Sequence, residues 1–202
     1  MKTKCLGSRS LRPLPFLVCL CLQSPSLFAA PATGHPRLWI READLPRLRS
    51  WAVDSNLIYA EGLAQLLDFA KTQMDQVNSN NIPPGPNVPN ADTGGRGYET
   101  YPTEMYAELF AFLSLIHPDP AERDALAQRA RFLLMYLVNE AIKGPDLGDP
   151  PARFRDPIFY TADSNRARWY GEAFGLTVDW IYPYLTAADK SAIRTVFLRW
   201  AD

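Results

Sequence analysis

The chain has few cysteines, and all of them lie near its start. Cys5, Cys19 and Cys21 precede residue 33, so residues 33–202 hold no cysteine for a disulfide, a thiolate nucleophile or a metal site. Histidine is scarcer still: His35 and His117 are the only two, and their separation matches no metal-ligand spacing. We predict no metal and no cofactor, and we interpret both histidines as turn residues.

Acidic residues outnumber basic ones beyond the first segment. The first 32 residues hold four of the 21 basic residues and none of the 22 acidic ones, which leaves a formal charge of −5 on the remainder. No basic patch typical of a nucleic-acid-binding surface is present there, so we predict no nucleic-acid partner. The chain also lacks an Asn-x-Ser/Thr glycosylation sequon.

The first 32 residues have the features of a secretory signal peptide. A basic start leads to the apolar run "LPFLVCLCL" at 14–22, which is far shorter than the roughly 20 residues that span a bilayer. Small residues then follow, and Ala30-Pro31-Ala32 fits a cleavage site after Ala32. We predict a secreted or periplasmic protein with no membrane span once residues 1–32 are removed. The alternatives are an uncleaved anchor, a buried core segment and a lipoprotein modified at Cys19 or Cys21.

Residues 33–202 have the pattern of a helical domain with negligible strand signal. Leu38-Trp39-Ile40 reads as a short buried anchor before a first helical turn. Apolar periodicity and capping residues then predict five helices: Ser55–Val77 with Ser55 as N-cap, Thr103–Ile116, a helix capped by Asp119 that runs to about Ala141, Asn165–Tyr184, and a last helix opened by the capping box Thr186–Asp189. Two long Pro/Gly-rich loops, 78–102 and 143–163, separate helical pairs and are expected to lie on one face.

The helices alternate in the width of their apolar surface. Thr103–Ile116 is apolar around most of its circumference, whereas the helix after Asp119 has one apolar stripe opposite a charged face that we expect to be solvated. The pattern then repeats. Helices that are apolar all round lie between two layers, and striped helices lie outside. We therefore predict an all-α fold, a partial (α/α) toroid of stacked helical hairpins that is incomplete at its C-terminal end.

A narrow polar stripe runs along the aromatic helix Asn165–Tyr184 and consists of Asn165, Arg168, Glu172, Gly175, Asp179 and Tyr182. Such a stripe is either paired inside the protein, part of an ordinary solvated face, or the lining of a cleft. In the last case the flat aromatic rings would stack on sugar rings while polar groups bind hydroxyls or carboxylates. The candidate saccharide-binding residues are Asn165, Arg168, Trp169, Tyr170 and Glu172 on this helix and Tyr98, Tyr101 and Glu104 at the rim of the first long loop. Paired hydrolytic carboxylates at Glu172 and Asp179 are disfavoured, because both would approach a glycosidic bond from the same helix.

Two blocks of the chain resemble one known family. "HPRLWIREADLPRLRS" (35–50) is similar to the opening segment of heparinase II/III-like and alginate-lyase-like polysaccharide lyases. "GLTVDWIYPYLTAADKSAIRTVFLRWA" (175–201) resembles their helical core pattern, an Asp-Trp near a Tyr followed by a capped helix. The resemblance implies an exported protein with an N-terminal (α/α) toroid and a following β-sandwich, which cleaves acidic polysaccharide by β-elimination.

The resemblance supplies no catalytic residue for this chain. In the family these residues are Asn, His and Tyr from later toroid helices and a His from the sandwich, which we expect beyond residue 202. We therefore predict an N-terminal segment of a lyase-like protein that is inactive alone. The alternatives are a non-catalytic extracellular helical module that binds glycan or acts as a scaffold, and a helical-hairpin glycoside hydrolase. On this hypothesis the last helix exposes Ile193, Val196, Phe197 and Trp200, and the chain self-associates through it.

The signal-peptide hypothesis makes a direct prediction about the exported protein. N-terminal sequencing of the exported chain should begin at Thr33, because Ala30 and Ala32 place small residues at the two positions that the peptidase reads. Ala30→Arg should leave the precursor uncleaved. An exported protein that keeps Met1 would contradict the prediction.

Overall fold

The computed structural model describes residues 34–75, 103–144 and 170–201, all of which lie in a compact unit that begins at Ala32. These residues are mostly helical and contain no strand, which confirms the predicted all-α class. The predicted signal peptide, all of the predicted loop 78–102 and most of the predicted loop 143–163 lie outside the described residues. None of the described helices is both long enough and apolar enough to cross a membrane.

The helices follow one another along the chain with short connections between several of them. Their order is 3-10 helix η1 (Glu42–Asp44), α1 (Leu45–Trp51), π-helix η2 (Ile58–Leu63), α2 (Ala64–Asp75), α3 (Thr103–Ile116), α4 (Pro120–Ala141), π-helix η5 (Tyr170–Phe174), α6 (Gly175–Trp180), 3-10 helix η6 (Tyr182–Tyr184) and α7 (Ala187–Ala201).

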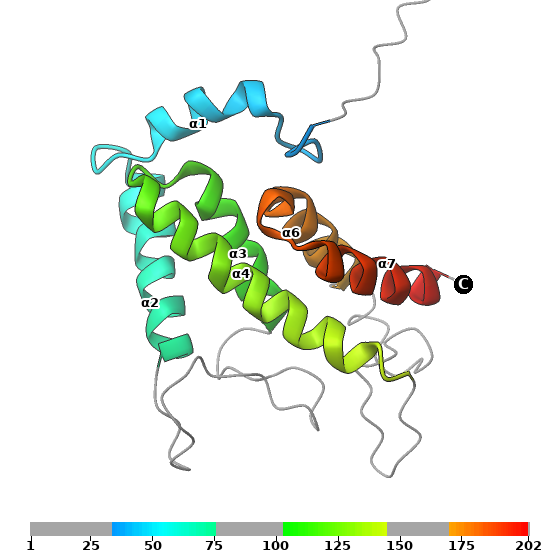
Figure 1. The fold of residues 1–202 in the computed structure, drawn as a ribbon. Coiled ribbons are helices and arrows are strands. Elements are labelled where there is room, and N and C mark those ends of the chain that lie inside the picture. The colour runs from blue at the N-terminus through cyan, green and yellow to red at the C-terminus, as the bar shows by residue number, and fades with distance from the viewer. Residues whose placement is uncertain (1–33, 76–102, 145–169, 202) are drawn as a thin grey trace, which may run out of the picture. The chain divides into compact units, whose positions relative to one another are not determined.

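Helix α3 lies at the centre of the described core. It contacts α1, α2, α4 and α6, and Figure 1 shows α2 on one side of the α3–α4 pair and α6 and α7 on the other. Its buried side chains cover nearly its whole circumference: Glu104, Tyr106, Ala107, Phe110, Ala111, Leu113, Ser114, Leu115 and Ile116. Helix α3 is therefore covered on most of its surface by other helices of the described residues.

Helix α4 begins and ends where its sequence predicts. Asp119 Oδ1 accepts the backbone N–H of Ala121 at 2.9 Å, and Pro120 is the first helical residue, where its missing N–H leaves no bond unmade. The predicted apolar stripe is fully or almost fully buried: Leu126, Ala130, Leu133, Leu134, Leu137 and Val138.

The charged face of α4 is not simply solvated, which corrects the sequence-based expectation. Glu122 pairs with Lys71 of α2, and Arg129 holds Asp75 of α2 through two hydrogen bonds of 2.7 Å. The hydrogen bond from Arg129 lowers the pKa of Asp75. Further along, Arg131 donates to Asp189 of α7 at 2.8 Å. The charges on α4 therefore connect it to a helix on each side, and sequence periodicity alone cannot distinguish such pairing from solvation.

The hydroxyl group of a tyrosine also binds the charged face of α4. Tyr184 of η6 donates its hydroxyl proton to Asp124 Oδ1 at 2.6 Å. Burial and this hydrogen bond raise the pKa of Tyr184 to about 12. The phenol is therefore neutral and a donor throughout the physiological range.

Helix α7 starts with the predicted capping box. Thr186 N–H donates to Asp189 Oδ2 at 2.8 Å, and Asp189 N–H donates to Thr186 Oγ1 at 3.1 Å. Burial alone would raise the pKa of the Asp189 carboxyl, but the hydrogen bonds from Arg131 and Thr186 outweigh it and hold the pKa below its usual value. Asp189 therefore serves both as a cap and as an ion-pair partner.

The expectation of an exposed apolar face on α7 is wrong for most of that face. Ile193, Val196 and Trp200 are buried, Phe197 is half-buried and stacks on Trp200, and the helix packs against α4. Leu198 is the large apolar side chain of α7 that stays exposed. The proposed surface for self-association is thus already covered within the chain.

Two predicted helix boundaries also need correction. The helix expected from Ser55 begins after Asn56, whose Oδ1 accepts the Ile58 N–H at 3.2 Å, and its first stretch is the π-helix η2. The expected helix Asn165–Tyr184 is described only from Tyr170, and it ends at Trp180 before the separate turn η6. Pro183 lies in that turn, where it lacks the N–H needed to continue an α-helix.

The Asp189 geometry predicts how stability depends on pH. Asp189→Asn should lower the free energy of unfolding by about 1–2 kcal/mol at neutral pH, because it removes the charge that pairs with Arg131. The folded pKa is lowered, so this stabilisation is complete above the unfolded value of about 3.9 and is lost as the pH falls through the folded pKa. Urea unfolding should show that the difference in unfolding free energy between wild type and Asp189→Asn becomes smaller in acid.

Asp68→Asn is the matched control, since Asp68 is exposed on α2. It should change stability little at either pH. A gap for Asp189→Asn that stays constant into strong acid would contradict the assignment.

Candidate functional site

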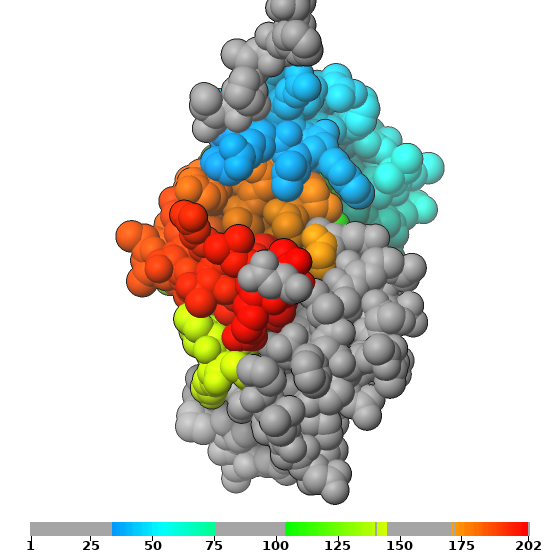
Figure 2. Space-filling view, turned by 90° about the vertical axis from the view of Figure 1, so that its right-hand side faces the viewer, coloured from blue at the N-terminus to red at the C-terminus, as the bar shows by residue number. Residues whose placement is uncertain are grey.

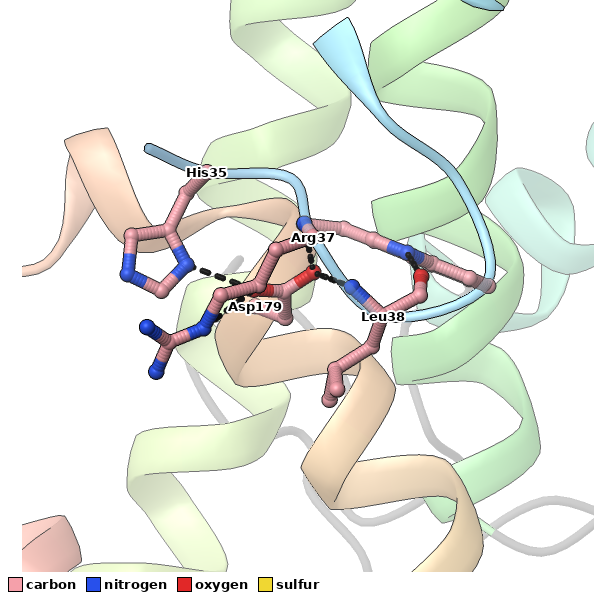
Figure 3. A network of polar contacts seen from close by, with 5 residues as sticks. His35, Arg37, Leu38 and Asp179 are labelled. Carbon is pink, nitrogen blue, oxygen red and sulfur yellow. Dashed lines mark hydrogen bonds and ion pairs between the residues drawn. The ribbon is translucent and has the colours of Figure 1, made fainter. Parts of the chain in front are cut away.

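The buried carboxylate of Asp179 binds the first described residues of the chain to α6. Oδ1 accepts from His35 Nδ1 at 2.5 Å, and Oδ2 accepts the backbone N–H groups of Arg37 at 2.7 Å and Leu38 at 2.8 Å. The Arg37 Nε lies 3.9 Å from Oδ1. Figure 3 shows these donors arranged around the carboxylate, whose side chain is only 3% exposed. We call this set of contacts the Asp179 latch.

The next residue of α6 completes the latch. Trp180 Nε1 donates to the Leu38 carbonyl at 3.2 Å, so both backbone polar groups of Leu38 are bound to α6. Pro36 is buried between the two bonded positions. In the space-filling view the segment that begins at residue 34 lies across the surface of residues 170–185 (Figure 2). Residues 35–38 therefore contact Asp179 and Trp180 of α6 directly.

The expected buried anchor Leu38-Trp39-Ile40 is a different structure. Leu38 is 44% exposed and Trp39 is 85% exposed, so their apolar side chains do not anchor this segment. Its backbone is held instead by a hydrogen bond to Asp179 of α6. The Ile40 N–H donates to the Leu38 carbonyl at 2.6 Å across Trp39, whose φ is +60°. This is a three-residue γ-turn with its central residue in the left-handed region, and it directs Trp39 outward.

Aromatic and cationic groups extend from the latch toward α7. The His35 ring stacks on Tyr182 with ring centroids 3.9 Å apart and an angle of 18° between the planes. Lys190 Nζ lies 3.8 Å from the centroid of the same Tyr182 ring. Tyr182 is thus held by the latch histidine and by a cation from the first turns of α7.

A groove of about 480 Å³ opens beside Tyr182. The described residues that line it are Val178, Tyr182, Lys190, Ser191, Ile193 and Arg194. Val178 and Ile193 contribute apolar surface, while Lys190 and Arg194 are four residues apart and on one face of α7. No acidic side chain is among these residues, and neither cation forms an ion pair with another described residue.

The charges in this groove favour an anion. Lys190 lies near the N-terminal end of α7, where the helix dipole is itself positive and disfavours a cation. Like charges at i and i+4 repel each other on a helix. An anion in the groove would relieve both effects, and the hydroxyls of Tyr182 and Ser191 could donate to it as well.

Most of the candidate residues predicted from sequence lie outside the described structure. This applies to Tyr98, Tyr101, Asn165, Arg168 and Trp169.

The other predicted residues fall on described helices. Tyr170 and Glu172 lie in η5, for which the backbone is described, and Glu104 is fully buried in the first turn of α3.

Of the polar stripe, Asp179 is paired inside the protein, which was one of the three predicted possibilities. The stripe also contained Tyr182, but the groove cations Lys190 and Arg194 and the role of His35 were missed. Spacing of Lys190 and Arg194 by four residues was the signal that could have indicated a cationic face.

No cluster of three His, Cys, Asp or Glu side chains able to hold a metal ion occurs among the residues that the structure describes. Comparisons of this chain with protein-family models, with curated proteins and with solved structures gave no match.

The latch predicts a specific pattern of stability loss. Asp179→Ala should lower the free energy of unfolding by about 1–3 kcal/mol, because the Arg37 and Leu38 amides lose their acceptor. Asp179→Asn should lose less, since one amide oxygen can still accept both N–H groups. Hydrogen exchange at the Arg37 and Leu38 amides should be fast in the alanine variant and slow in the asparagine variant.

The exposed Asp68 again supplies the control, as Asp68→Ala. Its unfolding free energy and exchange pattern should match the wild type. Equal protection of the two amides in wild type and Asp179→Ala would show that the latch does not hold them.

Proposed function

We propose that this chain is the helical, polysaccharide-binding part of an exported protein of the heparinase II/III-like type, with acidic polysaccharide as its ligand. The observation that carries the proposal is the cationic groove formed by Tyr182, Lys190 and Arg194. Its cations have no acidic partner among the described residues, and an aromatic ring lies beside them. Carboxylates of uronate sugars would bind the cations while the sugar ring contacts the aromatic and apolar surface.

The local charge of the groove matters more for such a ligand than the net charge of the protein. Residues 33–202 carry a formal charge of −5, which alone disfavours an anionic chain. A groove lined by two cations and no acid focuses a positive potential regardless of that sum. The acidic remainder of the surface would then disfavour non-specific anions, which supports selectivity.

The finer fold assignment belongs to the same proposal. The α3–α4 and α6–α7 pairs are helices joined by short connections, and they pack on one another through α3–α6 and α4–α7 contacts. Stacked pairs of this kind are the repeating unit of an (α/α) toroid. The docking of 35–50 onto 175–201 also brings together the two blocks on which the family resemblance rests.

Cleavage by β-elimination needs a group that neutralises the uronate carboxylate, a base for the C5 proton and an acid for the leaving oxygen. Lys190 and Arg194 suit the first requirement. The described groove lining contains no histidine and no carboxylate that could act as the base. We therefore assign binding, and no catalytic step, to these residues.

The absence of a catalytic base among the described residues that line the groove favours one second candidate, a glycan-binding module without catalysis. A glycoside hydrolase gains no support, because such enzymes use two carboxyl groups that flank the glycosidic bond. No carboxylate is among the described lining residues, and Asp179 is buried under its three donors.

The proposal predicts charge-selective binding. In affinity electrophoresis, a gel that contains a polyuronate should retard the purified chain, and a gel with a neutral glucan should not. The double variant Lys190→Gln/Arg194→Gln should bind the polyuronate about tenfold or more weakly, since two charge-assisted contacts are lost.

The matched control is Arg47→Gln/Lys143→Gln, which removes the same charge from exposed positions outside the groove. It should be retarded like the wild type. Equal migration of the wild type in polyuronate and neutral gels would refute an acidic ligand. Ultraviolet absorbance from unsaturated uronate then separates the two candidates: its appearance supports a lyase, and binding without it supports the non-catalytic module.

A further inference from the structure

Trp39 combines two features that are rarely found together in a soluble domain. Its side chain is 85% exposed, the highest value among the exposed large apolar side chains of the described residues. Its backbone φ of +60° is a conformation that glycine adopts easily and that a bulky residue adopts only with strain. Neither feature helps the fold, because an exposed indole buries nothing and a strained turn opposes folding.

The strain is maintained by the residues on each side of Trp39. Leu38 is held through its N–H by Asp179 and through its carbonyl by Trp180, and that carbonyl also accepts the Ile40 N–H. After Ile40, the Arg41 N–H donates to Asp44 Oδ2 at 3.0 Å at the start of η1. The indole therefore projects from a turn whose backbone is bonded before and after it, so that ordering it on a ligand loses little backbone freedom.

We propose that Trp39 is a stacking platform for a sugar ring, a second contact point for the saccharide chain beyond the Tyr182–Lys190–Arg194 groove. The inference rests on the proposed function for the nature of the saccharide. One face of a pyranose ring presents C–H groups, which pack on the flat indole, while the ring's hydroxyls stay in water.

The surroundings of Trp39 favour a saccharide over a protein partner. Within residues 34–50, Leu38 and Trp39 are the exposed large apolar side chains, and charged Arg37, Arg41 and Glu42 are exposed beside them. A stable protein interface needs about 800 Å² on each partner, far more than two side chains supply. A single sugar ring matches one indole.

The two arginines contribute charge rather than a defined contact. Figure 3 shows the Arg37 side chain on the His35 side of the Asp179 carboxylate, where Nε is 3.9 Å from Oδ1. Arg41 follows the turn in sequence and is also exposed. Cations that flank the platform in sequence would raise the local concentration of a polyuronate chain.

The test separates stability from binding. Isothermal titration of short polyuronate oligosaccharides should show about tenfold weaker binding to Trp39→Gly than to wild type, and Trp39→Phe should retain most of the affinity. Urea unfolding of Trp39→Gly should show a higher midpoint than wild type, because glycine relieves the positive φ. Trp51→Ala is the control: Trp51 is 51% exposed, but Arg47 already covers its ring at 4.6 Å.

The outcomes distinguish this inference from the proposed function. Unchanged affinity in Trp39→Gly, with loss in Lys190→Gln/Arg194→Gln, would overturn the platform alone. If wild type binds no polyuronate but binds a neutral hexose oligosaccharide in a Trp39-dependent way, the platform is supported and the proposed acidic ligand is wrong. If wild type binds neither saccharide, the platform is overturned. Trp39-dependent binding to phosphatidylcholine–phosphatidylglycerol vesicles without Trp39-dependent saccharide binding would overturn it in favour of a membrane surface.

Discussion

One buried carboxylate connects the beginning of the described chain to its last helical pair. Asp179 accepts three hydrogen bonds from residues 35–38, and the adjacent Trp180 contributes a fourth contact in the opposite direction. Few apolar side chains of this segment are buried, so the segment owes its position to polar bonds. Both the stacking of His35 on Tyr182 and the γ-turn at Trp39 follow from that placement. The groove and the exposed indole therefore depend on the same carboxylate.

Polar contacts also hold the outer helix α4 to its neighbours. Its apolar stripe packs on α3, while Glu122 and Arg129 bind α2 and Arg131 binds α7. Each pair is partly exposed, so each adds little to stability by itself. Together they fix the relative rotation of three helices, a task for which non-directional apolar packing is poorly suited. Burial of the apolar core thus drives folding, and the ion pairs fix how the helices are rotated relative to one another.

The parts of this fold that could be predicted are those encoded by neighbouring residues. The bounds of α3 and α4, the cap at Asp119 and the Thr186–Asp189 box all follow from local patterns and are confirmed. The errors involve partners distant in sequence. The charged face of α4, the apolar face of α7 and the exposure of Trp39 each depend on which helix or segment lies opposite, and periodicity does not contain that information. For the same reason Asp179 could be placed on a polar stripe, but its partners, 141 to 144 residues away, could not be named.

The separation in sequence between His35 and Asp179 has a consequence for how the protein is made. Synthesis proceeds from the N-terminus, so His35 leaves the ribosome 144 residues before the carboxylate that binds it. Until α6 emerges, the opening segment has no docking surface and stays accessible to the machinery that acts on nascent chains. The opening segment can therefore become ordered on the rest of the unit only after the last described helical pair has formed.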